Sequence, residues 1–230
     1  MYEKWINVLS KTLLFKDIQA EHLMSMAQCI QPRVCHYKKH EYIAIAGDDF
    51  EGVGIILSGA ASVIKENAAG NRVIISMLDE SDMFGEMAAF SSLTKWPASV
   101  QAQNPVTALF IPGEKIVGSC PNACVGHKKL IINMLKIISE KALMLNKKVD
   151  YLSIKSMRGK ISTYLLEQYN KAGSLIFMLP MNRNELADFL NVSRPSMSRE
   201  MSRLRDEGII DYYMSSIKIK DLETLKKMTE

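Results

Sequence analysis

The sequence predicts an α+β protein built from a β-rich domain, one long helix and a helical C-terminal domain. Short apolar runs broken by glycine or charge extend over residues 33–112, helical periodicity begins near residue 121, and two capped helices follow residue 180. The 230 residues are 47% hydrophobic and 23% charged, which is the balance of a globular protein. The expected domains cover residues 1–120, 121–152 and 153–230.

The first domain is expected to be a β-sandwich or barrel with N-terminal helices in front of it. Several short strands separated by turn signals are typical of these folds. The segment ENAAGNR predicts a hairpin turn, because Gly70 and Asn71 tolerate positive φ angles. The predicted strands lie in the runs YIAIAG, VGIILSG, AASVIKE, RVIISML, SVQA and VTALFI.

The long helix is expected to pair with a second copy of the chain. Its apolar residues recur at steps of three and four, the spacing of a coiled-coil seam. Pro121 and Asn122 predict its start, and a helix of about 30 residues spans about 45 Å, which is more than a small domain needs. The alternative is a core helix packed on its own β domain. The residues predicted at the dimer interface are Ile131, Met134, Ile138, Leu145 and Val149.

Residues 182–208 are predicted to form two helices with a tight connection. Asn182 and Glu185 have the spacing of a capping box, and Asn191 with Val192 forms the turn. Ser193 caps the second helix, where proline is tolerated in the first turn. The segment IIDYYMSSIKIK predicts a short hairpin after the second helix, and DLETLKKM a terminal helix or tail.

The outward face of the second helix favours DNA as the partner. Four arginines and one glutamate lie between residues 194 and 205, on a chain whose net charge is only +4. Arginine pairs bidentately with guanine, and serine reaches a base edge or a phosphate. The alternative is a helical hairpin whose polar face is merely solvated. The predicted DNA contacts are Arg194, Ser196, Ser198, Arg199, Ser202 and Arg203.

This combination resembles the Crp/Fnr family, the relatives of the catabolite activator protein. The resemblance covers nearly the whole chain and is carried by VGIILSGAASVIKENAAGNRVIISMLDESDMFGEMAAF and NVSRPSMSREMSRLRDEGII. It implies a cyclic-nucleotide-binding-type β-roll (a jelly roll), a dimerisation helix and a winged helix-turn-helix. The implied partners are a palindromic double-stranded DNA operator, a second copy of the chain, an unidentified small-molecule effector and RNA polymerase.

Carried over by position, the resemblance assigns the main DNA contacts to Arg194, Ser198 and Arg199. Pro195 stands where the family often has a glutamate that helps to read a base. Because a proline side chain has no hydrogen-bonding group, the half-site preference is expected to differ from that of those relatives.

The sensor side departs from the relatives that bind cyclic AMP. Those relatives combine a Gly-Glu turn with an Arg-Ser or Arg-Thr pair, but the residues near the arginine's place are Lys95-Trp96-Pro97-Ala98. A missing guanidinium removes a charge-assisted pair worth about 1.5–3 kcal/mol, so we predict that cyclic AMP is not the effector. Trp96 is expected at an exposed turn, where it lines a pocket or fills the phosphate site. The candidates for the effector pocket are Gly85, Glu86, Met87, Lys95, Trp96 and Ser99.

The cysteines predict neither a metal site nor a disulfide. Cys29, Cys35, Cys120 and Cys124 match no structural zinc spacing, and reduced thiols are the default expectation. Alternatives are redox sensing at Cys120 and Cys124, or an iron–sulfur site if the fold unites both cysteine pairs. For His36 and His40, solvated side chains are expected, with a haem ligand as the alternative. No apolar run approaches the roughly 18 residues of a membrane span, and no signal peptide is recognised, so a cytoplasmic location is expected.

Two other functional classes compete with the DNA-binding regulator. One is a metal-dependent β-roll enzyme, which is disfavoured because the predicted neighbouring strands carry no cluster of His and Glu ligands. No nucleophile elbow, P-loop, dinucleotide fingerprint or zinc-protease motif occurs either. The other is a cyclic-nucleotide-binding module that acts on a protein partner, which the arginine- and serine-rich helix argues against.

Overall fold

A computed structural model describes residues 3–66, 72–118 and 125–229. The chain divides into two compact units, residues 1–140 and 141–230, so the division falls within the long helix. The predicted hairpin turn at Gly70 and Asn71, the predicted helix start at Pro121 and Asn122, and Cys120 and Cys124 lie outside the described residues.

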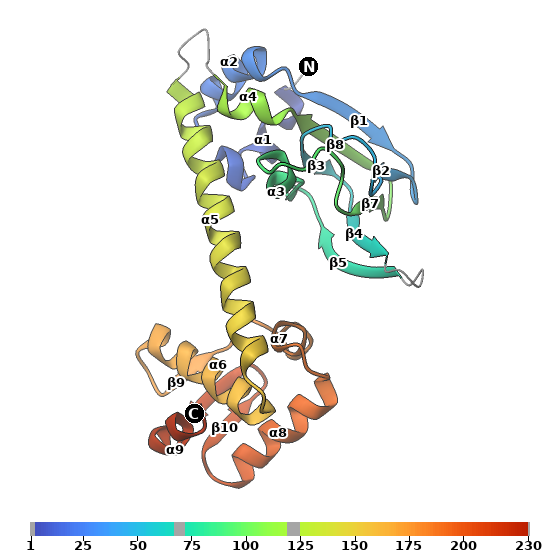
Figure 1. The fold of residues 1–230 in the computed structure, drawn as a ribbon. Helices are drawn as coiled ribbons and strands as arrows, with labels where there is room; N and C mark the ends of the chain where they lie inside the picture. Colours follow the sequence, from blue (N-terminus) through green and yellow to red (C-terminus); the bar gives the residue numbers. More distant parts are fainter. Residues whose placement is uncertain (1–2, 67–71, 119–124, 230) are drawn as a thin grey trace. The chain divides into compact units, whose positions relative to one another are not determined.

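The first unit contains two four-stranded antiparallel sheets (Figure 1). Their strand orders are β1-β8-β3-β6 and β2-β7-β4-β5. The strands are β1 Arg33–Tyr37, β2 Tyr42–Ala44, β3 Val53–Ser58, β4 Ala61–Glu66, β5 Arg72–Leu78, β6 Met83–Phe84, β7 Ser99–Ala102 and β8 Val106–Ile111.

The central strands β3 and β8 are buried on both faces, which explains their continuous apolar sequences. In β8, Ala108 and Phe110 point into the core between the two sheets, whereas Leu109 and Ile111 point into a second core under the helices. Ile56 and Ile55 alternate in the same way in β3. A strand with apolar layers on both sides needs no polar alternation.

Helices cover one sheet of the first unit. The elements are two 3₁₀ turns (Glu3–Trp5 and Leu13–Phe15), α1 Ile6–Leu9, α2 Ala20–Ile30, α3 Glu86–Ala89, α4 Gly113–Val117 and the first half of α5 Val125–Ser153. Met26 of α2 and Leu130 of α5 belong to the core that covers β3 and β8. The buried amide of Asn133 donates hydrogen bonds to the carbonyl oxygens of Leu14 and Lys16, at 3.0 and 2.8 Å.

All six predicted apolar runs form strands, although some are shorter than their runs. YIAIAG, for example, contributes only Tyr42–Ala44. Two further strands of the first unit are not predicted by the sequence. In β1, Arg33 and His36 interrupt the apolar pattern, and β6 has only two residues. Both are hydrogen-bonded to a neighbour whose position the local sequence does not reveal.

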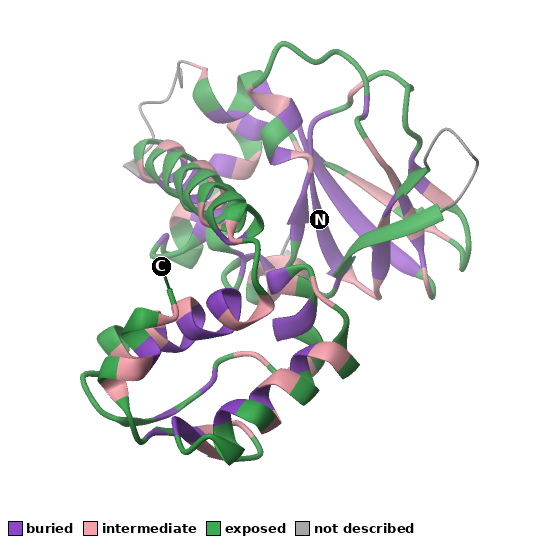
Figure 2. Ribbon diagram, turned by 60° about the horizontal axis from the view of Figure 1, so that its bottom comes forward, coloured by how far each residue is buried: buried purple, intermediate pink, exposed green. Residues whose placement is uncertain are grey.

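The second unit is a helical domain with a three-stranded antiparallel sheet of order β10-β11-β9. Its elements after α5 are α6 Met157–Ala172, β9 Ile176–Met178, α7 Arg183–Leu190, α8 Arg194–Asp206, β10 Ile210–Tyr213, β11 Ser216–Ile219 and α9 Leu222–Lys227. Figure 2 shows that buried and exposed residues share these helices. The apolar sides meet in one core that includes Tyr164, Leu190 and Met201. None of the described helices is long and apolar enough to cross a membrane.

Candidate nucleic-acid interface

The start of α7 is held by the predicted capping box. The Asn182 side chain accepts hydrogen bonds from the backbone N–H groups of Asn184 and Glu185, at 2.9 and 3.0 Å. The Glu185 carboxylate accepts from the backbone N–H of Asn182 at 2.7 Å. These bonds satisfy donors that the first turn of a helix leaves without partners.

The tight turn between α7 and α8 depends on Asn191. Its φ of +52° lies in the left-handed region, which asparagine tolerates better than most residues. The backbone N–H of Val192 then donates to the carbonyl oxygen of Ala187 at 2.9 Å. Ser193 caps α8, and Pro195 lies in its first turn. The predicted connection is therefore confirmed.

The inner face of α8 is apolar and buried, which fixes its outer face toward solvent. Met197, Met201 and Leu204 pack in the core of the second unit. Arg194, Ser198, Arg199 and Arg203 are exposed, whereas Ser196 and Ser202 are half-buried.

The two half-buried serines already have partners within the chain. The Ser196 hydroxyl lies 2.8 Å from Ser193 Oγ and accepts from Arg199 Nη2 at 3.2 Å. Ser202 Oγ lies 3.1 Å from the hydroxyl of Tyr212 on β10. Ser202 thus ties α8 to the adjacent sheet, a role that the helix pattern alone did not indicate.

The ring of Tyr212 lies next to two arginines that are not among the predicted DNA contacts. The guanidinium carbons of Arg183 and Arg205 lie 4.9 and 5.2 Å from the centre of its ring, within the range of cation–π attraction. Burial lowers the pKa of Arg183. No local motif reveals this cluster, because its members come from α7, α8 and β10.

A cavity of about 420 Å³ lies where the starts of α7 and α8 approach the β10–β11 hairpin. Arg183, Arg194 and Tyr212 line it together with Asn182, Asn184, Met214 and Ser215. The hairpin turn includes Met214, whose φ is +52°. Arg183 and Arg194, beside the N-terminal ends of two helices, form a surface that favours anionic groups.

The predicted effector-pocket residues come together only in part. Gly85 has a φ of +81°, and a Cβ there would stand 2.9 Å from the ring of Trp96. Trp96 is only 6% exposed and packs on Phe50 and Phe84, with ring centres 4.4 and 6.0 Å apart. The expectation of an exposed Trp96 is therefore wrong, because two aromatic neighbours from distant segments enclose its ring.

The remaining pocket candidates differ in exposure. Glu86 is buried and Met87 exposed. Lys95 Nζ lies 2.8 Å from Asp49 Oδ1 at the surface, and this hydrogen-bonded ion pair lowers the pKa of Asp49 and raises that of Lys95. Ser99 Oγ accepts from the backbone N–H of Ala46 at 3.0 Å. Among the described residues, no three His, Cys, Asp or Glu side chains are grouped to hold a metal ion.

The residues of α5 predicted at the dimer interface differ in exposure. Leu145 and Val149 are exposed, and Ile131 and Ile138 are half-buried. Met134 is only 2% exposed and belongs to the core of the first unit. The prediction for Met134 is corrected, because the β domain already covers that side of the helix, whereas the next residue, Leu135, is exposed.

Comparison with known families identifies both halves of the chain. Residues 34–119 match the family "Cyclic nucleotide-binding domain", and residues 159–228 match "Crp-like helix-turn-helix domain". The chain is 21% identical over 210 residues to the anaerobic regulatory protein of Bacillus subtilis, covering 89% of this chain and 86% of that protein. It is 24% identical to the transcriptional activator protein FnrA of Stutzerimonas stutzeri, covering 80% of this chain and 75% of that protein.

Solved structures show the same fold. The catabolite activator protein of Thermus thermophilus aligns with a TM-score of 0.52 at 20% identity, covering 95% of this chain and 98% of that one. CprK in complex with OCPA aligns with a TM-score of 0.61 at 13% identity, covering 90% and 93%. The chain belongs to the Crp/Fnr family and is a DNA-binding transcription regulator of that type.

Proposed function

We propose that the protein is a homodimeric, sequence-specific regulator rather than an enzyme, and that it reads DNA with the exposed face of α8. The observation that carries the proposal is the contrast between the two sides of this helix. Met197, Met201 and Leu204 anchor it in the domain, which leaves Arg194, Arg199 and Arg203 exposed. A helix held in this way can enter a major groove and present arginines to guanine edges and phosphates.

Dimerisation would occur through the exposed seam of α5. Leu135, Ala142 and Val149 are spaced by seven residues, as are Ile138, Leu145 and Leu152. Together these residues have the alternating steps of three and four that a coiled coil requires. The two recognition helices of such a dimer would read half-sites about 34 Å apart, so the operator would be palindromic.

The β-roll would receive the regulatory signal, with an effector other than cyclic AMP. Trp96 occupies the region where cyclic-AMP-binding relatives supply an arginine, and its ring packs on Phe50 and Phe84. Lys95, the nearest cation in sequence, is already paired with Asp49. A cyclic phosphate would therefore lack the guanidinium that those relatives supply at this position, and with it a charge-assisted hydrogen bond.

Selection from a random-sequence duplex pool tests the DNA-binding proposal. The purified chain should enrich a two-fold symmetric sequence, and sedimentation should give a complex of two protomers with one duplex. Arg199→Ala should reduce the enrichment and relax the preference at the base pair that Arg199 reads, while exposed Lys39→Ala on the first unit serves as a control of equal charge change. Enrichment of an asymmetric site by a single protomer would contradict the dimer proposal.

Calorimetric titration tests the effector proposal. Cyclic AMP should give no saturable heat up to millimolar concentration. Saturable micromolar binding would overturn this part of the proposal and leave the DNA-binding part intact.

A further inference from the structure

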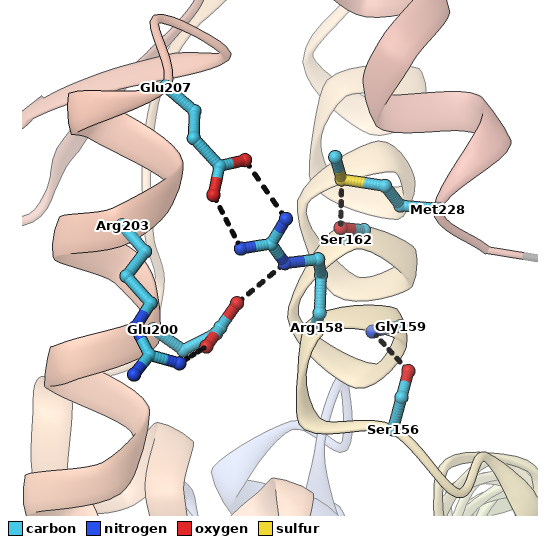
Figure 3. A network of polar contacts seen from close by, with 8 residues as sticks. All are labelled: Ser156, Arg158, Gly159, Ser162, Glu200, Arg203, Glu207 and Met228. Carbon is cyan, nitrogen blue, oxygen red and sulfur yellow. Dashed lines mark hydrogen bonds and ion pairs between the residues drawn. The ribbon is translucent and has the colours of Figure 1, made fainter.

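Arg158, the second residue of α6, bridges two points on the recognition helix. Its Nε donates to Glu200 Oε1 at 2.6 Å, while Nη1 and Nη2 donate to the two carboxylate oxygens of Glu207 at 2.9 and 2.7 Å (Figure 3). Glu200 and Glu207 are seven residues apart, which places them on one face of the helix, two turns from each other. One guanidinium therefore holds both the middle and the end of α8.

The bridge has features of a strong ion pair. The Glu200 side chain is only 12% exposed, so little water competes for its charge. Glu207 caps the C-terminal end of α8, where the helix dipole disfavours a carboxylate, and the guanidinium offsets that charge. The fork geometry is specific to arginine, because lysine presents a single point charge.

Glu200 also connects Arg158 to the outer face of α8. Its second oxygen, Glu200 Oε2, accepts from Arg203 Nη1 at 3.3 Å (Figure 3). The Arg203 side chain is 70% exposed and belongs to the surface proposed to contact DNA. While Arg158 neutralises Glu200, Arg203 makes one long contact with that carboxylate. Without Arg158, both oxygens of Glu200 would be available to bind Arg203, and the negative charge of Glu200 would repel the DNA phosphates.

We propose that Arg158 is a positioning residue for DNA binding, which acts through Glu200 to hold Arg203 ready for its contact. The inference rests on the proposed function, since it assumes that Arg203 contacts DNA. It also predicts which arginine does not depend on Arg158. Arg194 lies at the opposite end of α8, six residues before Glu200, and should contribute independently.

A pair of double-mutant cycles tests the inference. The dissociation constant of the full chain for the duplex recovered by selection is measured for the native protein and for Arg158→Met, Arg203→Ala and Arg194→Ala. It is also measured for Arg158→Met combined with each of the other two substitutions. Arg158→Met should weaken binding about tenfold in the native and Arg194→Ala backgrounds, and less than about threefold in the Arg203→Ala background. Residues in one ion-pair network show coupling of this order, whereas separate residues add independently.

Arg158→Lys is the second variant, and it tests whether the two-carboxylate hydrogen bonding of the guanidinium is required. It keeps the positive charge and should retain part of the affinity, and it replaces Arg158→Met in both cycles if thermal unfolding shows that Arg158→Met does not fold. Equal losses in the Arg203→Ala and Arg194→Ala backgrounds would overturn the inference and reduce Arg158 to a structural role. If Arg203→Ala alone left the affinity unchanged, the proposed Arg203 contact would be wrong and the inference would fall with it, whereas DNA binding by the rest of α8 would stand.

Discussion

Leu145→Ala and Leu143→Ala form a matched pair of substitutions in α5. Both remove the same atoms from exposed leucines, which are 55% and 68% exposed, and both carry the same small change in helix propensity. Leu145 lies on the proposed seam, three residues after Ala142, whereas Leu143 lies directly beside that seam position. Only the Leu145 change should weaken the dimer.

The size of the effect follows from the exposure of Leu145. Full burial of a leucine side chain is worth about 1.5–3 kcal/mol. Since about half of this side chain is still exposed in one protomer, its burial at the interface is worth about 1 kcal/mol. A symmetric dimer contains two copies, so Leu145→Ala should cost about 2 kcal/mol, or about a 30-fold rise in the dissociation constant of the dimer.

Sedimentation equilibrium over a range of protein concentrations measures that constant for both variants and the native chain. Leu143→Ala should change it by less than about threefold, and circular dichroism should show equal helix content. The seam would be wrongly placed if Leu143→Ala weakened the dimer as much as Leu145→Ala, or if Leu145→Ala had no effect.

The remaining predictions concern the core, the DNA-binding face and the helix caps. Met134→Ala should lower the free energy of unfolding by about 2–5 kcal/mol in urea titrations because it leaves a cavity, without the loss of dimer affinity expected at Leu145. Trp96→Ala should cost about 3–5 kcal/mol in the same assay, and a near-neutral result would show that its ring does not pack as described. Arg199→Ala should cost about 1–3 kcal/mol of DNA affinity in fluorescence anisotropy if it reads a guanine; a uniform loss over all sequences with a shallower salt dependence would instead indicate a phosphate contact. Asn182→Ala should lower the thermal midpoint through a cap loss of about 1 kcal/mol, which Asn182→Ser should largely restore.

The Trp96 ring packs against the Gly-Glu turn of the β-roll. Gly85 keeps the positive φ of the Gly-Glu turn, and its missing Cβ leaves room for the Trp96 ring. The turn is thus retained as part of the aromatic packing with Phe50 and Phe84.

The helix-turn-helix was predictable because its signals are local. The capping box of Asn182 with Glu185, the left-handed turn at Asn191 and the cap at Ser193 each depend on residues within three or four positions. Such patterns can be read directly along the chain. The strands β3 and β8 are equally predictable from the sequence, because burial of both faces gives each a continuous apolar run.

Tertiary structure decided the features that depend on residues far apart in sequence. Helical periodicity marks the apolar residues of α5, but the β domain determines that Met134 faces a core while Leu145 remains exposed. The same limit applies to Trp96, which the aromatic neighbours enclose, and to Arg158, whose partners lie more than 40 positions away on α8. Local spacing determines which elements form, whereas the burial and pairing of each side chain depend on which elements meet in space.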